Sequence, residues 1–188
     1  MRITGGSLTG RKINVPHGNE EIRPSMDKMR ESVFACLGDL TGLSFLDIFT
    51  GSGIIALEAA SRGAAFIEAV EQDTRKRKTL IENVSISHTR INCRFMPAEL
   101  YIKRADTRKD RVSFDIIFLD PPFPYQFKWE LISKLAVSSL VKNGSKILIH
   151  RPRPDYLREV IQNLVKTDSR EYGRSVVDFF DVFFAENR

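Results

Sequence analysis

Three short segments of the sequence combine an acidic side chain with glycine or proline, and each has the residue types to bind a small ligand or an amine. The first segment runs from Asp47 to Gly53 and contains two glycines one residue apart, Gly51 and Gly53. Glycines in such a turn let a ligand approach the main chain without a Cβ atom in the way. A carboxylate at Asp47 would attract an ammonium or sulfonium group and would repel a pyrophosphate.

The second acidic position is Glu71, which follows a short apolar run. The residues from Gly51 to Ala56 also fit the GxGxxA pattern of dinucleotide-binding proteins, in which a carboxylate about 20 residues further on binds the ribose hydroxyls. NAD is therefore an alternative ligand, which would make the chain an NAD-dependent oxidoreductase. That alternative leaves Asp47 and the third segment unexplained.

The third segment, Asp120-Pro121-Pro122-Phe123, ends an uninterrupted apolar run. Its two prolines fix the main chain and remove two amide donors, so the turn offers mainly acceptors. Acceptors without donors suit a substrate that presents an amino group. The ring of Phe123 adds a flat face on which a base could stack.

These segments need a scaffold that brings them together, and the pattern of the chain predicts one. Apolar runs alternate with stretches of helical spacing, which is typical of a doubly wound, mostly parallel α/β sheet. In such sheets ligands bind beyond the carboxyl ends of the strands. The predicted strands cover residues 43–49, 66–70, 90–96, 114–119, 146–150 and 176–185. The predicted helices cover residues 25–37, 54–62, about a dozen residues after Asp73, a short stretch after Pro97, residues 127–140 and residues 157–165.

The first residues of the chain are rich in glycine, with β-forming residues between. This pattern predicts a short hairpin arm rather than part of the core. We therefore divide the chain into an amino-terminal arm, residues 1–22, and one α/β domain, residues 23–188.

The composition excludes several classes of protein. A chain of 188 residues with 42% hydrophobic and 28% charged residues is neither disordered nor a coiled coil. It has no apolar run long enough to span a membrane and no secretory signal, so we expect a cytoplasmic protein. Cys36 and Cys93 are too few and too isolated for a disulfide framework or a metal site. The net charge of +5, concentrated between residues 75 and 111, is compatible with a polyanionic partner.

Motifs across almost the whole chain resemble one known family. The sequences DIFTGSG, VEQD and DPPF are similar to those of class I S-adenosylmethionine-dependent methyltransferases that modify exocyclic amines. RITGGSLTGRKINVPHG, RPSMDKMRESVF, LEAASRGA and REYGRSVVDFF resemble the bacterial RsmD-type family of 16S rRNA guanine-N2 methyltransferases. The resemblance covers about residues 2–184 and implies a seven-stranded, Rossmann-like sheet with an antiparallel last hairpin.

The resemblance also implies roles for individual residues. Those expected to bind S-adenosylmethionine are Asp47, Phe49, Gly51, Gly53, Glu71, Gln72, Ala98 and Glu99. Those expected to form the catalytic motif are Asp120, Pro121, Pro122 and Phe123. Those expected to bind the RNA substrate are Arg2, Arg11, Lys12, Arg23 and Arg30.

Two positions depart from the family pattern. The family often has Asp or Asn where this chain has Pro97, so the adenine contact would fall to the main chain of Ala98 or to Glu99. The fifth strand often ends in glutamate, but here it ends in His150, which we interpret as a core or surface histidine.

The function implied by the resemblance is methyl transfer from S-adenosylmethionine to the exocyclic N2 of a guanine in 16S rRNA, with S-adenosylhomocysteine as the product. We expect a monomer that acts on a 30S subunit or an assembly intermediate. An adenine-N6 methyltransferase acting on DNA or RNA would share the DPPF turn but not the arm. A non-catalytic RNA-binding protein would have no need of an intact acceptor turn.

Overall fold

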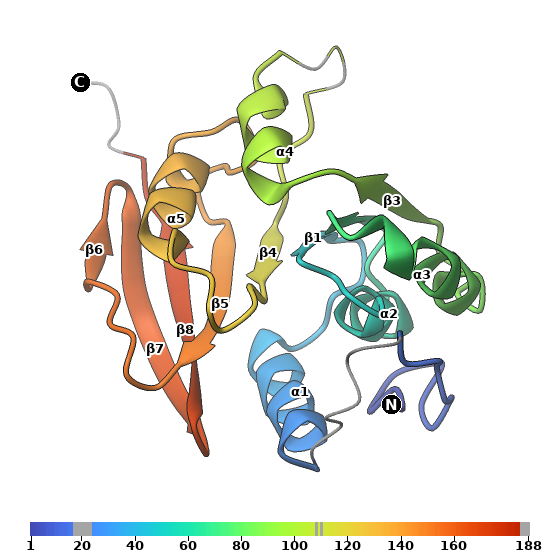
Figure 1. The fold of residues 1–188 in the computed structure, drawn as a ribbon. Coiled ribbons are helices and arrows are strands. Elements are labelled where there is room, and N and C mark those ends of the chain that lie inside the picture. Colours follow the sequence, from blue (N-terminus) through green and yellow to red (C-terminus); the bar gives the residue numbers. More distant parts are fainter. Residues whose placement is uncertain (17–23, 108, 110, 185–188) are drawn as a thin grey trace.

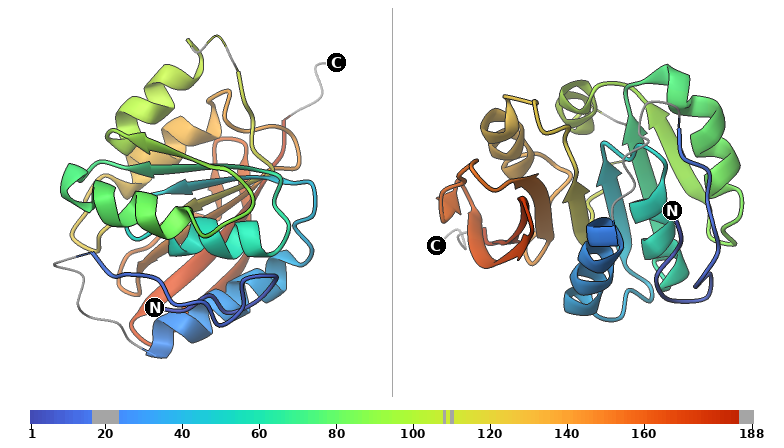
Figure 2. Two further views of the ribbon diagram at one scale, coloured as in Figure 1. Left: turned by 90° about the vertical axis from the view of Figure 1, so that its right-hand side faces the viewer. Right: turned by 60° about the horizontal axis from the view of Figure 1, so that its bottom comes forward.

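The computed structural model describes residues 1–16, 24–107, 109 and 111–184. These residues form one eight-stranded sheet with helices on both faces, as Figures 1 and 2 show. The strands are β1 (Ser44–Ile48), β2 (Phe66–Glu71), β3 (Ile91–Phe95), β4 (Ile116–Leu119), β5 (Lys146–Pro152), β6 (Val160–Ile161), β7 (Leu164–Tyr172) and β8 (Ser175–Val182). The helices are α1 (Pro24–Leu37), α2 (Ile54–Ser61), the 3₁₀ turn η1 (Thr74–Lys76), α3 (Arg77–Val84), α4 (Ala98–Ala105) and α5 (Lys128–Ala136).

The order of the strands places the ligand crevice between β1 and β4. The sheet runs β3-β2-β1-β4-β5-β8-β7-β6, and its first five strands are all parallel. The chain moves outward from β1 to β3 and then returns to the other side of β1 as β4, so the order of strands reverses there. The doubly wound, mostly parallel α/β fold is confirmed, and its switch point lies where such sheets bind ligands.

The far edge of the sheet is antiparallel, and it corrects one prediction. β5 pairs with β8, and β8 pairs with β7, in the antiparallel sense. The helix predicted for residues 157–165 was wrong: the short strand β6 lies there and pairs with the start of β7. Leu157, Ile161 and Leu164 are buried at helical spacing, but a turn with Gln162 at a φ of 55° reverses the chain between them. β6 also raises the number of strands from the expected seven to eight.

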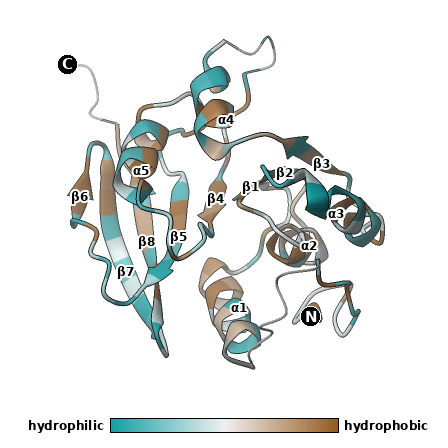
Figure 3. Cartoon of the chain, in the orientation of Figure 1, coloured by the Kyte–Doolittle hydropathy of each residue, from teal (hydrophilic) through white to brown (hydrophobic). Residues whose placement is uncertain are grey.

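Two hydrophobic clusters cover the two faces of the sheet. One joins α1, α2 and α3 to the sheet, and the other joins α4 and α5 to it. All four residues of β4 are buried, as its uninterrupted apolar run predicts for a strand covered on both faces. Figure 3 shows this hydrophobic centre in brown. A buried parallel strand leaves only its carboxyl end accessible, which is where the acceptor turn begins.

The amino-terminal arm is part of the core, contrary to the prediction. Ile3, Leu8 and Ile13 are buried in the cluster under α2, although the described residues 1–16 of the arm form one bridge of hairpin type, between Arg2 and Lys12. Gly6 has a φ of 79°, and a Cβ atom there would lie 1.9 Å from the carbonyl oxygen of Ser61. The arm therefore packs tightly on α2. The proposed boundary between residues 22 and 23 lies outside the described residues and stays a prediction.

Candidate active site

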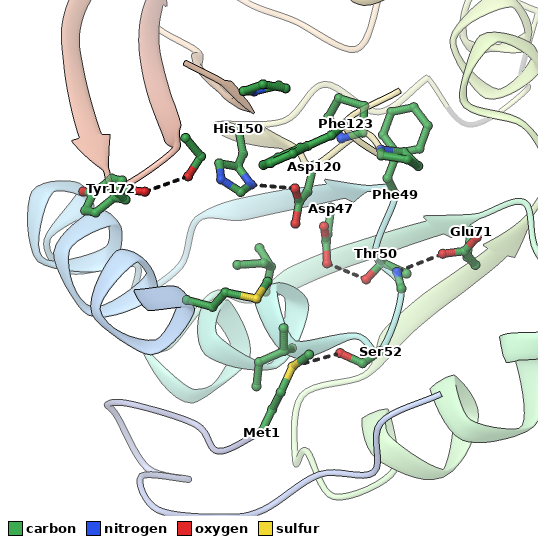
Figure 4. A pocket seen from close by; sticks show the side chains of 18 of the residues that line it. Met1, Asp47, Phe49, Thr50, Ser52, Glu71, Asp120, Phe123, His150 and Tyr172 are labelled. Atoms are coloured by element: carbon green, nitrogen blue, oxygen red, sulfur yellow. Dashed lines mark hydrogen bonds and ion pairs between the residues drawn. The ribbon is translucent and has the colours of Figure 1, made fainter. Parts of the chain in front are cut away.

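A cavity of about 1420 Å³ lies at the carboxyl ends of β1, β2, β4 and β5 (Figure 4). Its volume exceeds the roughly 300–1000 Å³ of a pocket for one small ligand, so it has room for a cofactor and a base together. The predicted residues that line it are Asp47, Phe49, Gly51, Glu71, Gln72, Asp120, Pro121, Pro122 and Phe123. The structure thus brings the three acidic segments into one space.

Asp47 ends in the cavity with one carboxylate oxygen unpaired. Its Oδ2 accepts hydrogen bonds from the Thr50 hydroxyl and from the amide of Ala56, at 3.1 Å for the latter. Its Oδ1 is buried and has no partner among the described residues. Burial raises the pKa of Asp47 to about 7, and the negative charges of Asp120 and Glu71 act in the same direction. A buried, unpaired carboxylate oxygen in a cavity fits a cationic donor from a ligand.

Glu71, at the end of β2, is held against the glycine turn. Its Oε2 accepts from the amide of Gly51 at 2.9 Å, and its Oε1 accepts from the amide of Asp73 at 2.8 Å. Lys76 approaches Oε2 at 3.5 Å. A carboxylate can accept about four hydrogen bonds. One position therefore remains for a ribose hydroxyl, and displacement of Lys76 would open a second.

The acceptor turn is tied to β1 and to α5. The amide of Asp120 donates to the carbonyl of Ile48 at the end of β1, at 3.1 Å. Lys128 of α5 donates to the carbonyl of Phe123 at 3.0 Å, which holds the far end of the turn. No hydrogen bond from the described residues reaches the carbonyl oxygen of Pro121. Phe123 is 46% exposed at the cavity mouth. The turn therefore presents the acceptors and the open aromatic face that its sequence predicts.

His150 is buried, as one of its two interpretations expected, but it also lines the cavity and contacts the Asp120 carboxylate, which the sequence did not predict. Its Nδ1 lies 2.8 Å from Asp120 Oδ1, and the residue is 6% exposed. Figure 4 shows Asp120 between His150 and Asp47. Burial lowers the pKa of His150, but the charge and the hydrogen bond of Asp120 outweigh it and raise the pKa above its usual value. The position of His150 at a strand end, beside the strand that carries Asp120, was the signal that sequence reasoning passed over.

Three of the predicted cofactor residues do not line the cavity. Gly53 has a φ of 83°, and a Cβ atom there would lie 2.8 Å from Leu80, so its role is to let α2 begin against α3. Ala98 is buried in the cluster beneath α4. Glu99 is exposed and accepts a hydrogen bond from the Tyr125 hydroxyl. Because the Tyr125 ring packs against Phe49 at 5.4 Å between centroids, Glu99 reaches the cavity wall only through Tyr125.

The predicted RNA-binding residues that the structure describes also lie outside the cavity, and Arg30 requires a correction. Arg30 is 1% exposed and forms ion pairs with Asp27 at 2.6 Å and Glu58 at 3.2 Å. This burial argues against the predicted contact with RNA and gives Arg30 a structural role. The three basic residues of the arm, Arg2, Arg11 and Lys12, are exposed. Arg23 lies outside the described residues.

Several lining residues come from distant parts of the chain, and no site role was predicted for them. They include Met1, Met26, Arg153, Tyr172 and Arg174. Met26 belongs to α1. Arg153 follows β5, Tyr172 ends β7, and Arg174 lies in the turn between β7 and β8. Their assembly depends on the packing of α1 and the hairpin, which spacing along the sequence does not encode.

Comparison with known proteins identifies the family of the chain. The family model described as "Conserved hypothetical protein 95" matches residues 1–181. The chain belongs to this family. A relative from Buchnera aphidicola, "Ribosomal RNA small subunit methyltransferase D", is 31% identical over 155 residues, which are 80% of this chain and 78% of the relative. The expected RsmD-type methyltransferase is thereby confirmed.

Solved structures of the same architecture agree with this placement. The structure titled "Putative methyltransferase yhhF from Escherichia coli" has a TM-score of 0.82 and 26% identity, and the match covers 97% of each chain. A second structure, SMU.776, is described as a methyltransferase complexed with SAH. It has a TM-score of 0.67 at 17% identity, over 86% of this chain and 50% of that one, and it supports the fold of the RsmD-type chain.

Proposed function

We propose that this RsmD-type chain transfers a methyl group from S-adenosylmethionine to the exocyclic N2 of a guanine in 16S rRNA. One observation carries the proposal: the cavity joins the unpaired oxygen of Asp47 to the acceptor turn at Asp120. Burial is the main cause of the raised pKa of Asp47, and the negative charge of Asp120 across the same cavity raises it further. A cationic ligand between the two carboxylates would relieve their repulsion.

The cofactor side of the cavity fits S-adenosylmethionine. Asp47 would accept a donor of the ligand's positively charged methionine end, and Glu71 would accept from the ribose. Gly51, with a φ of 56°, keeps the turn close to Glu71 and free of a side chain. Bound there, the cofactor would supply a methyl group made electrophilic by its sulfonium. The nearby pair of carboxylates disfavours the pyrophosphate of NAD.

The acceptor side fits an exocyclic amine. The amino nitrogen of guanine is a poor nucleophile because its lone pair is delocalised into the ring. Asp120 and the Pro121 carbonyl would each accept one N–H of this amine, which favours a pyramidal nitrogen and aims its lone pair at the methyl carbon. Asp120 would stabilise the positive charge that develops on nitrogen and would accept the released proton, directly or through water. Phe123 would stack on the base after it leaves its helix.

The substrate is expected to be a folded ribonucleoprotein surface. The basic residues Arg2, Arg11 and Lys12 of the arm are exposed and would contact phosphates, which position RNA without reading its sequence. A single small domain has few base contacts with which to select one guanine, so shape would have to contribute. We therefore propose that a monomer acts on a 30S subunit or an assembly intermediate in the cytoplasm. None of the helices in the described part of the chain is long and apolar enough to cross a membrane.

Mass spectrometry of nucleosides tests the proposed function. 30S subunits and assembly intermediates from cells that lack the gene would be treated with the purified protein and S-adenosylmethionine, and their rRNA would then be digested. We expect one N2-methylguanosine to appear, as in RNA from cells that retain the gene. Appearance of N6-methyladenosine, in this RNA or in DNA, would instead assign an adenine-N6 methyltransferase. Stabilisation on heating by NAD but not by S-adenosylhomocysteine would overturn the cofactor assignment.

A further inference from the structure

The strongest unexplained feature of the cavity is the pairing of His150 with Asp120. His150 lies near the end of β5, and its Nδ1 lies 2.8 Å from Asp120 Oδ1. The side chain of His150 is 7% exposed, whereas that of Asp120 is 29% exposed. One oxygen of the catalytic carboxylate is therefore fixed from the buried side, and the carboxylate still faces the cavity.

The surroundings of His150 limit what it can do. Its Nε2 is buried and has no partner among the described residues, so it has no group through which to pass a proton onward. Its ring packs edge-on against Phe123 at 5.6 Å between centroids, so it contacts both ends of the acceptor turn. In the sheet it pairs with Val177 of β8, which is apolar. This environment suits a fixed, neutral ring better than a proton shuttle.

We propose that His150 is a positioning residue for Asp120: its neutral Nδ1–H donates to Oδ1 and leaves Oδ2 free to accept the incoming amine. This role rests on the proposed methyl transfer to an exocyclic amine. A hydrogen bond from Nδ1 fixes the tautomer with an unprotonated Nε2, which is the form that a buried nitrogen without a partner tolerates best. The carboxylate then needs no reorientation when the amine arrives.

The charge state of His150 determines whether Asp120 can act as a negatively charged acceptor for the amine. An imidazolium would neutralise Asp120 and add a positive charge beside the amine, where positive charge also develops during transfer. The neutral form is therefore the active one, and turnover at saturating substrates should rise with pH through the pKa of His150. The ionisable groups that share its cavity are Asp47, Glu71, Asp73, Lys76, Asp120, Arg153, Tyr172 and Arg174. Of these, Asp120 is the one that shifts the pKa of His150.

Asp47 also titrates, but its effect is separable. Its pKa of about 7 concerns the cofactor side, so its protonation should weaken cofactor binding. The Asp47 dependence should therefore appear in the KM for S-adenosylmethionine, and the His150 dependence should appear in kcat.

Three variants of His150 test the role in turnover. The amide nitrogen of H150N can occupy the place of Nδ1, that of H150Q falls nearer the place of Nε2, and H150F fills the space without a donor. We expect H150F and H150Q to lower kcat by roughly tenfold to a hundredfold with the KM for S-adenosylmethionine unchanged. We expect H150N to restore most of kcat and to lose the pH dependence that His150 causes. Equal losses in H150N and H150F, or wild-type kcat in H150F, would overturn the proposal.

A second measurement needs no activity. The imidazole ¹⁵N signals of the folded protein report the tautomer and the pKa of each histidine, and the signal absent from H150N identifies His150. We expect Nδ1 to carry the proton in the neutral ring. We also expect D120N to lower the pKa of His150 and to leave the exposed His88 unchanged. An unchanged His150 in D120N would refute the pairing even if the chain methylates guanine. A shifted His150 in a protein that methylates another amine would refute only the proposed substrate.

Discussion

The two sides of the cavity are built in different ways. The cofactor side is buried and held by the main chain: Asp47 accepts from the amide of Ala56, and Glu71 accepts from the amide of Gly51. The acceptor side is held by two prolines and by side chains, and Phe123 at its mouth is 46% exposed. The first side is thus formed before a small ligand arrives, whereas the second stays open to a base that belongs to a large RNA.

This difference predicts that substitutions can impair cofactor binding on one side, and turnover or RNA binding on the other, separately. Changes on the cofactor side should alter affinity for S-adenosylhomocysteine, and they should alter folding because that side belongs to the core. Changes on the acceptor side should alter turnover or RNA binding and leave folding almost unchanged, because partly exposed groups contribute little to stability.

The largest effect is expected from Asp120. Replacement by alanine removes an acceptor of the amine and the negative charge beside the developing positive charge, so kcat should fall by roughly a hundredfold to a thousandfold. The affinity for S-adenosylhomocysteine, measured by calorimetry, should stay within about threefold of wild type, because Asp120 lies beyond the cofactor side. E130A removes an exposed acidic residue of α5 that lies outside this cavity, and it should retain turnover. Wild-type turnover in D120A would refute its catalytic role.

Asp47 should produce the next largest effect, and its effect should depend on pH. A cationic ligand favours the ionised carboxylate, so below the pKa of about 7 the binding of S-adenosylhomocysteine should release a proton from Asp47. Affinity should therefore fall as the pH is lowered from 8 to 6. Calorimetry at pH 6 in buffers with different ionisation enthalpies measures the proton released. D47N should bind roughly tenfold to a hundredfold more weakly at pH 8 and release no such proton.

The same shift makes a prediction for stability without ligand. The pKa of Asp47 is raised from 3.8 in a model peptide to about 7 in the folded protein, so the folded state holds a proton that the unfolded state has lost. This contribution to stability is fully present below about pH 4 and is lost as the pH rises through 7. Comparison of wild type with D47N in urea at pH 5.5 and pH 8 isolates it. A difference that does not change with pH would show that Asp47 is not a buried titrating group.

The sequence predicted the strand-end residues on both sides of the cavity, but it wrongly placed Gly53, Ala98 and Glu99 there and missed His150. Glycines, strand-end carboxylates and the Pro-Pro turn are local features, and a parallel sheet brings strand ends together whatever the remaining loops do. His150 was not predicted as a site residue because a lone histidine at a strand end belongs to no recognisable sequence pattern. Arg30 misled for a similar reason: its sequence does not show that Glu58 of α2 packs against it.

The errors in fold also have a common cause. The spacing of Leu157, Ile161 and Leu164 fits a helix, but pairing with β7 and the turn at Gln162 decide in favour of a strand. The glycines of the arm indicate turns, yet Ile3, Leu8 and Ile13 complete the core beneath α2. In both segments tertiary contacts outweigh the local secondary-structure preference. The spacing of residues along the sequence reports only that local preference.

Phe123 should affect RNA more than the cofactor. Removal of its ring would abolish base stacking, which contributes roughly 1–3 kcal/mol per base, so the KM for RNA should rise by about tenfold or more. Binding of S-adenosylhomocysteine and the midpoint of thermal unfolding should change little, since the ring is half exposed. F127A is the matched control, because Phe127 is nearby, 61% exposed and absent from the cavity wall. Equal effects of F123A and F127A would argue against a stacking role.

The smallest effect is expected from Asn83, which ties the arm to the cofactor side. Its amide nitrogen donates to the carbonyls of Ser52 at 2.8 Å and Asn14 at 2.9 Å, and its amide oxygen accepts from the Asn14 amide at 2.9 Å. N83A would leave the buried carbonyl of Ser52 unpaired and would remove both bonds to Asn14, so the free energy of unfolding should fall by about 1–3 kcal/mol.

The affinity of N83A for S-adenosylhomocysteine should fall only a few-fold, because Asp47 and Glu71 keep their own main-chain bonds. The neighbouring variant E82A, at an exposed position of α3, controls for changes in the helix itself. Urea unfolding and calorimetry on the two variants separate these effects. If N83A left stability unchanged but lowered kcat, the arm would act on the acceptor side instead, and the distinction between a preformed side and an open side would be wrong.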